Sequence, residues 1–129
     1  MNIGLGSKRK TILLIDSNPH ERSILRIALE AVGFTVGESV NGDEGERTTA
    51  RIKPDAILAD SMMETIDAGG TIMDKLRRAG TSAPLYIVST LGDALVGSVS
   101  LQELGIAGVF IKPIDPAIVI QTLKTRLNM

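Results

Sequence analysis

Four polar residues with reactive side chains each follow a short apolar run in this chain. They are Asp16 after TILLI, Asp60 after AILA, Ser89 after LYIV and Lys112 after VFI. A carboxylate can serve as a nucleophile or a metal ligand, and a lysine can neutralise charge on a reacting group. These residue types predict a site with such chemistry if the fold brings the four run ends together.

The apolar runs are expected to be strands. They lie at 11–15, 34–40, 56–59, 85–89 and 109–111, and they lack clean alternation, which is typical of parallel strands covered on both faces. Helical spacing is found at 19–32, 43–52, 70–79, 94–104 and 116–127, with Asn18 as a cap and Lys75 on the outer side of its helix.

Five strands and five helices in strict alternation predict an α/β fold, a flavodoxin-like doubly wound five-stranded parallel sheet. Sites in such sheets form where strands reach their carboxyl ends. All four polar residues end strands, so Asp16, Asp60, Ser89 and Lys112 are expected at one edge. A lone acid there is commonly a cap, but the joint pattern favours a site.

The amino-acid composition excludes several classes of function. The 129 residues, 43% hydrophobic, suit one domain at 10–129 after a flexible tail at 1–9. A net charge of −1 and 2% aromatic residues give no nucleic-acid platform. The lack of cysteine and the single histidine exclude the usual zinc clusters. The apolar runs are too short to span a membrane, and no secretory h-region is present. A cytoplasmic domain is therefore predicted.

Other phosphate-binding and catalytic motifs are missing. The stretch GLGSKRK (4–10) precedes the first strand and lacks the Gly-Lys-Ser/Thr ending of a phosphate loop. DSNPHE after the first strand has no glycine fingerprint, and no nucleophile elbow is present. A nucleotide- or flavin-binding protein would therefore rest on fold analogy alone.

The chain resembles the receiver domain of two-component response regulators over about residues 10–129. The segments that carry the resemblance are ILLIDSNP, PDAILADSMM, PLYIVST and GIAGVFIKP, in this order. The resemblance implies that Asp60 is the phosphoacceptor, that Ser89 and Lys112 bind the phosphoryl group, and that the bond before Pro113 is cis. It implies no enzyme beyond self-phosphorylation and self-dephosphorylation.

The resemblance also implies a Mg²⁺ site. Its ligands would be Asp16, Asp60 and the backbone carbonyl of Met62. The family usually has a second acid where Ser17 stands, so Ser17 is expected to make only a weak or water-mediated contact. Losing one charge near the ion changes the interaction by roughly 4 kcal/mol at an effective dielectric near 20, partly offset by hydration. We therefore expect weak Mg²⁺ binding.

Three further departures from the family pattern bear on the site. Glu64 stands where a proline is common, and it is expected to be a solvated loop residue unless it replaces the lost acid. Val109 stands at the position of the aromatic switch residue, and the adjacent Phe110 should face the other way. Counting from Pro84 selects Ser89 as the hydroxyl residue, whereas counting back from Lys112 selects Thr90; Ser89 is preferred.

Apolar residues Met62 and Leu91 would flank the phosphoryl group, which suggests slow hydrolysis. The leading hypothesis is a receiver that takes a phosphoryl group from a histidine kinase or phosphotransfer protein and acts through an unknown downstream protein, without nucleic acid or membrane. A homodimer through residues 94–127 is compatible with the sequence. The alternative is a pseudo-receiver, an interaction module that works without phosphorylation. The sequence does not say whether the chain is full length.

Overall fold

Five strands and four helices occur in the part of the chain that the computed structural model describes, residues 9–60, 71–90 and 105–129. The strands are β1 (Thr11–Ile15), β2 (Thr35–Ser39), β3 (Ala56–Asp60), β4 (Leu85–Ser89) and β5 (Ile106–Ile111). The helices are α1 (Pro19–Ala31), α2 (Gly42–Ile52), α3 (Ile72–Arg78) and α6 (Pro116–Arg126). The expected helix at 94–104 and residues 1–8 of the expected tail at 1–9 lie outside the described residues.

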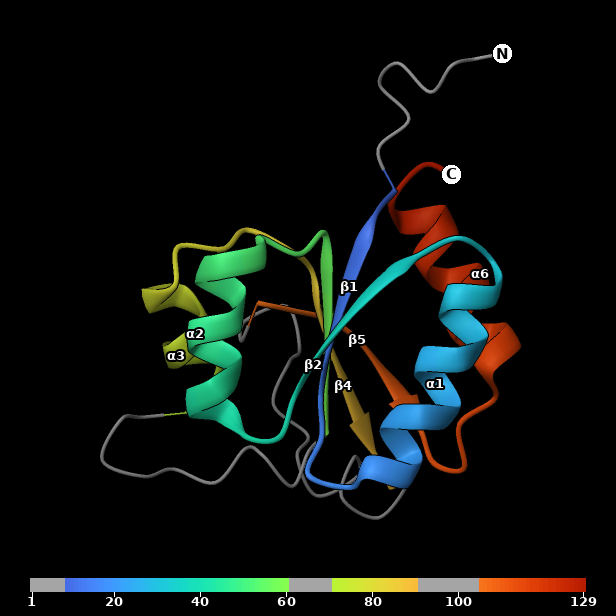
Figure 1. Ribbon diagram of the computed structural model, residues 1–129, viewed down its shortest axis with the longest axis horizontal. Coiled ribbons are helices and arrows are strands. Elements are labelled where there is room, and N and C mark those ends of the chain that lie inside the picture. Colours follow the sequence, from blue (N-terminus) through green and yellow to red (C-terminus); the bar gives the residue numbers. More distant parts are fainter. Residues whose placement is uncertain (1–8, 61–70, 91–104) are drawn as a thin grey trace.

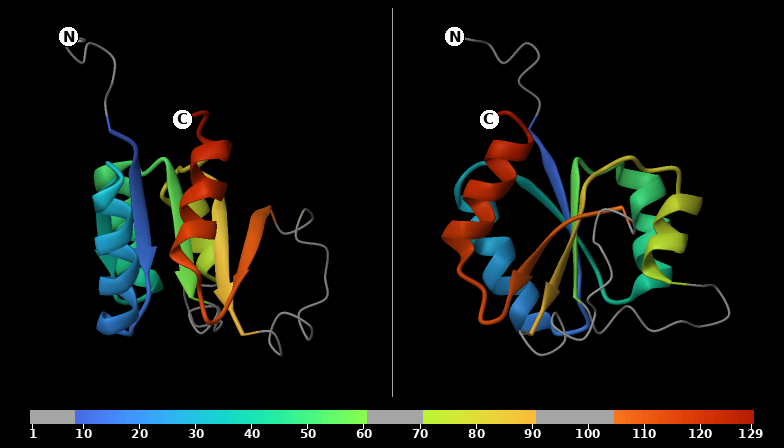
Figure 2. Two further views of the ribbon diagram at one scale, coloured as in Figure 1. Left: turned by 90° about the vertical axis from the view of Figure 1, so that its right-hand side faces the viewer. Right: turned by 180° about the vertical axis from the view of Figure 1, so that it is seen from behind.

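The strands form one parallel sheet in the order β2-β1-β3-β4-β5, which confirms the predicted flavodoxin-like fold. All carboxyl ends lie at the edge where α1 begins (Figure 1). Seen from the side, the strand arrows point the same way and end along this edge (Figure 2). Residues that end different strands are therefore brought to one edge, as predicted.

Each face of the sheet carries its own apolar core. Helices α1 and α6 cover one face, and α2 and α3 cover the other (Figure 1). Alternate residues of each strand supply the two cores, so that Ile12 and Leu14 pack under α1 and α6 while Leu13 and Ile15 pack under α2 and α3. A strand residue's side is therefore set by its parity.

Lys75 corrects one expectation. It was predicted on the outer side of its helix, but it is buried between α2 and α3, where its ammonium lies 3.0 Å from Asp43 Oδ1. Gly42 has no side chain, and a Cβ built there would lie 3.3 Å from the Lys75 stem. The glycine thus leaves room for a lysine that helical spacing alone could not place.

Among the described residues, none of the helices has the length and hydropathy of a transmembrane helix.

Candidate functional site

Three of the four predicted polar residues meet at the carboxyl edge of the sheet. Lys112 Nζ donates a hydrogen bond to Asp60 Oδ2 at 2.6 Å. Asp16, Asp60 and Lys112 line one cavity of about 310 Å³ beside the first turn of α1. Asp60 is only 4% exposed, but it borders this cavity. The Lys112–Pro113 peptide bond is cis, as the sequence resemblance implied.

Strand parity explains why these three side chains meet. Asp16 and Asp60 lie two residues beyond Leu14 and Leu58, which pack in the core under α1 and α6. Lys112 lies two residues beyond Phe110 of the same core. Side chains two apart on a strand point to the same face, so all three extend the α1 and α6 side of the sheet.

Ser89 lies on the opposite face of the sheet from these three residues. It lies two residues beyond Ile87, which packs in the core under α2 and α3. Ser89 is buried and its hydroxyl donates to the Thr90 carbonyl at 3.0 Å, whereas Thr90 is exposed. Ser89 is not among the described residues that line the cavity, although its carbonyl accepts from the Lys112 N–H at 2.8 Å. Its predicted role stays a prediction.

The remaining residues singled out in the sequence do not line the cavity or lie outside the described residues. Ser17 is exposed and is not among the described residues that line the cavity. Met62, Glu64 and Leu91 lie outside the described residues. Val109 and Phe110 pack in different cores, as predicted, and the Phe110 ring stacks on Tyr86 with centroids 5.2 Å apart.

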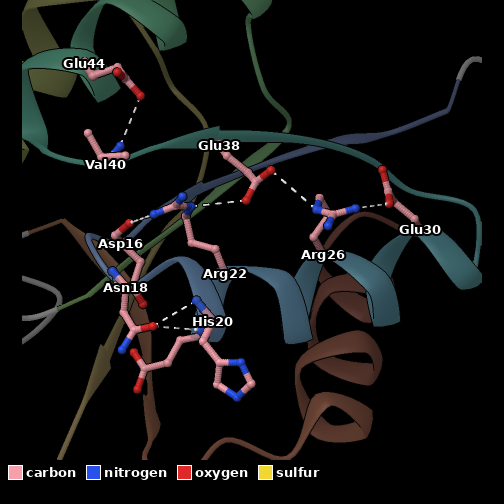
Figure 3. Close-up of polar contacts among 10 residues, drawn as sticks. Asp16, Asn18, His20, Arg22, Arg26, Glu30, Glu38, Val40 and Glu44 are labelled. Atoms are coloured by element: carbon pink, nitrogen blue, oxygen red, sulfur yellow. Dashed lines mark hydrogen bonds and ion pairs between the residues drawn. The ribbon is translucent and has the colours of Figure 1, made fainter.

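Glu21 and Arg22, both in the first turn of α1, are site residues that the sequence analysis missed. Glu21 Oε2 lies 3.4 Å from Lys112 Nζ. Arg22 donates to the backbone carbonyl of Asp16 and, at 3.1 Å, to Glu38 Oε1 of β2 (Figure 3). A signal was present for Glu21, because it lies four residues before Leu25 and eight before Leu29, the buried positions of α1.

Charges in the cavity perturb one another. Burial, together with the nearby Asp60 and Glu21 carboxylates, raises the pKa of Asp16 to about 6, although the backbone N–H of Asn18 opposes the rise. Burial lowers the pKa of Lys112, but its contacts with Asp60 and Glu21 outweigh this and hold the pKa above its usual range. Among the described residues that line the cavity, the carboxylates of Asp16, Glu21 and Asp60 therefore outnumber the Lys112 ammonium, and Arg22 is already paired with Glu38.

This donor set fits a divalent cation. One carboxylate oxygen each from Asp16, Glu21 and Asp60 lies within 4.8 Å of the others. Mg²⁺ takes oxygen ligands and keeps several waters, so it needs few protein carboxylates. The residues present thus match the chemistry of the Mg²⁺ site that the resemblance implies.

Known proteins with similar sequences belong to one family. Residues 12–124 match the model of the response regulator receiver domain. Protein PilH of Pseudomonas aeruginosa is 28% identical over 90% of this chain and 96% of its own length. The regulator RpaA of Synechocystis is 34% identical over 63% of this chain, and the chain spans about a third or less of the length of RpaA and of the transcriptional regulator GlrR of Escherichia coli.

Solved structures share the fold. A response regulator from Desulfuromonas acetoxidans matches with a TM-score of 0.78 at 19% identity, over 92% of this chain and 97% of its own. The chemotaxis response regulator CheY4 of Vibrio cholerae matches with a TM-score of 0.74 at 18% identity, over 92% and 98%.

Proposed function

Because the chain belongs to the response regulator receiver domain family of two-component signalling, we propose that Asp60 accepts a phosphoryl group from a histidine kinase or a phosphotransfer protein. The observation that carries this proposal is the position of the Asp60 carboxylate on the cavity wall, in direct contact with Lys112. Receiver domains are signalling domains, so the chain is not proposed to be an enzyme.

The proposed step is a phosphoryl transfer between side chains. An oxygen of the Asp60 carboxylate attacks phosphorus, the P–N bond of a phosphohistidine breaks, and the imidazole leaves with the bonding electron pair and takes up a proton. The product is an acyl phosphate on Asp60. Lys112 is placed to balance charge on the phosphoryl oxygens, and Ser89, once its hydroxyl is released from Thr90, is proposed to bind one of them.

Mg²⁺ would be held by Asp16, Asp60 and the carbonyl of Met62, with Ser17 in weak or water-mediated contact. When bound, the ion neutralises negative charge on the transferring group. Asp16 is held ready for this by the Asn18 N–H, which donates to Asp16 Oδ1 at 2.8 Å. Phosphorylation is then proposed to bias a surface that includes β5 and α6 and binds a downstream protein or a second copy.

Incubation with a small phosphodonor and Mg²⁺, followed by intact-mass measurement, tests the proposal. We expect a gain of one phosphoryl group that is lost in Asp60→Asn. Asp115→Asn is the matched control, because Asp115 caps α6 and asparagine caps equally well. A phosphorylated Asp60→Asn variant would contradict the assignment.

The second candidate is a pseudo-receiver that binds partners without phosphorylation. Ser17 in place of the usual acid favours it, as does the low exposure of Asp60. This candidate predicts no mass gain even at high Mg²⁺, together with partner binding that is the same for the wild type and Asp60→Asn. The same pair of proteins therefore separates the two functions.

A further inference from the structure

We propose that Glu21 supplies the second acidic ligand of the divalent-cation site, in place of the acid that Ser17 does not provide. The inference rests on the proposed function, because the cation is the one that the phosphoryl transfer uses. It differs from the expected ligand set in its source: the carboxylate comes from the first turn of α1 and not from the loop residue next to Asp16.

Position on α1 aims Glu21 at the site. Glu21, Leu25 and Leu29 are spaced by four residues and lie on one stripe of the helix. Leu25 and Leu29 are buried against the sheet, so Glu21 continues this stripe beyond the carboxyl ends of the strands. Ser17 is exposed and carries a neutral hydroxyl. The helix therefore brings a carboxylate to the side of the sheet that already holds Asp16 and Asp60.

At the start of α1 the Glu21 carboxylate is not used to cap the helix and contacts Lys112 instead. An acid at this third helical position commonly accepts a hydrogen bond from the backbone N–H of the cap residue. In α3, Asp74 does this with Thr71 at 3.1 Å. In α2, Glu44 accepts at 3.1 Å from Val40, the residue before the cap Asn41 (Figure 3 shows this contact). In α1 the Asn18 N–H donates instead to Asp16. Glu21 is thus released from the usual capping role.

Distances suit a shared ion. Ligand oxygens on opposite sides of one Mg²⁺ lie about 4.2 Å apart, twice the usual Mg–O distance. The three carboxylate oxygens of Asp16, Glu21 and Asp60 already lie within 4.8 Å of one another, so small side-chain rotations are sufficient. With Lys112 the ionised site carries a formal charge of −2, which is the charge that an adjacent acidic pair would give without Glu21.

A competing explanation is that Glu21 only holds Lys112, to which it is paired at 3.4 Å. Under that explanation Glu21 is a positioning residue, and its effect on the cation must pass through Lys112. The two explanations make different predictions when Lys112 is neutralised. A double-mutant cycle on these two residues therefore decides between them.

Calorimetric titration with Mg²⁺, supported by Mn²⁺ paramagnetic resonance, measures the cation affinity directly. We expect Glu21→Gln to weaken binding about tenfold or more, whereas the control Glu30→Gln, which removes the same charge from the exposed end of α1, changes it less than about twofold. Ser17→Asp added to Glu21→Gln should restore affinity. In the Lys112→Met background, Glu21→Gln should still weaken binding about tenfold.

Equal affinities for Glu21→Gln and Glu30→Gln would overturn the assignment, as would a loss that vanishes in the Lys112→Met background. Wild-type protein that binds no Mg²⁺ would overturn it as well. Intact-mass phosphorylation of the wild type is measured in parallel. If Asp60 is phosphorylated while Glu21→Gln binds Mg²⁺ normally, the ligand assignment fails and the proposed function stands. If Asp60 is never phosphorylated although Glu21→Gln loses Mg²⁺, the reverse holds.

Discussion

The first turns of α1 and α3 carry an acid at the same helical position and use it differently. Asp74 of α3 completes a reciprocal capping box with Thr71. Glu21 of α1 contacts Lys112 instead, because the cap N–H it would accept from is bonded to Asp16. One hydrogen bond at the end of β1 thus separates a structural acid from a site acid. Local sequence motifs alone would assign both residues to capping.

The largest expected effect is the loss of stability when a buried leucine of either helix is truncated. Leu29→Ala in α1 and Leu76→Ala in α3 each remove a side chain that is at most 1% exposed. Each should lower the free energy of unfolding by about 2–5 kcal/mol, with the same value with and without Mg²⁺. Urea denaturation measures this, and Ile27→Ala, at a 60% exposed position, is the control. A Mg²⁺-dependent loss in Leu76→Ala would break the comparison, since α3 should not serve the site.

Asp16→Asn tests the charge crowding at the start of α1. The folded pKa of Asp16 is about 6 and its ordinary value is 3.8, so the folded state holds the proton more tightly and wild-type stability falls as pH rises from about 4 to about 6. Asparagine carries no such charge and can still accept from Asn18. In EDTA at about pH 7.5 the variant should be more stable by about 1–2 kcal/mol, after discounting for partial exposure.

Urea denaturation at about pH 4 and about pH 7.5 checks this prediction. Most of the gain should disappear at the lower pH, where Asp16 is protonated in the folded wild type. A gain of the same size at both pH values would show that the substitution acts through packing and not through charge.

The caps themselves give a smaller effect. Thr71→Ala and Asn18→Ala each remove a side-chain acceptor for backbone N–H groups, and each should destabilise the protein by about 1 kcal/mol. Only Asn18→Ala should also weaken Mg²⁺ binding, because it loosens the turn that carries Glu21. Thermal unfolding and calorimetry measure the two effects, with Thr71→Ser as the conservative control. Equal Mg²⁺ affinities would contradict the difference drawn between the two turns.

The smallest effect is the titration of Asp74. Hydrogen bonds from the backbone and the hydroxyl of Thr71 hold its pKa below the ordinary value of 3.8, the opposite direction to Asp16. Its stabilising contribution is therefore present above pH 3.8 and lost as pH falls through the folded pKa. Carboxyl NMR titration should show Asp74 titrating below Asp16 by a wide margin. Thr71→Ala should move the Asp74 pKa upward.

The sequence determined the sheet and most of the edge. Apolar runs of strand length and alternating helices were enough for the strand order, because parallel strands joined by short connections have few arrangements. The strand-end positions of Asp16, Asp60 and Lys112 followed from the same runs. The buried Lys75 did not, because its place depends on the space that Gly42 leaves in a neighbouring helix.

Only the tertiary structure decided which side chains share the cavity. Strand parity relative to the two cores directs Asp16, Asp60 and Lys112 to one face and Ser89 to the other, and no single run reveals that relation. Glu21 joins the three because α1 packs on their face and because Asp16 occupies the N–H that would have capped it. Such assignments depend on contacts between segments, so local sequence could suggest the candidates but not select among them.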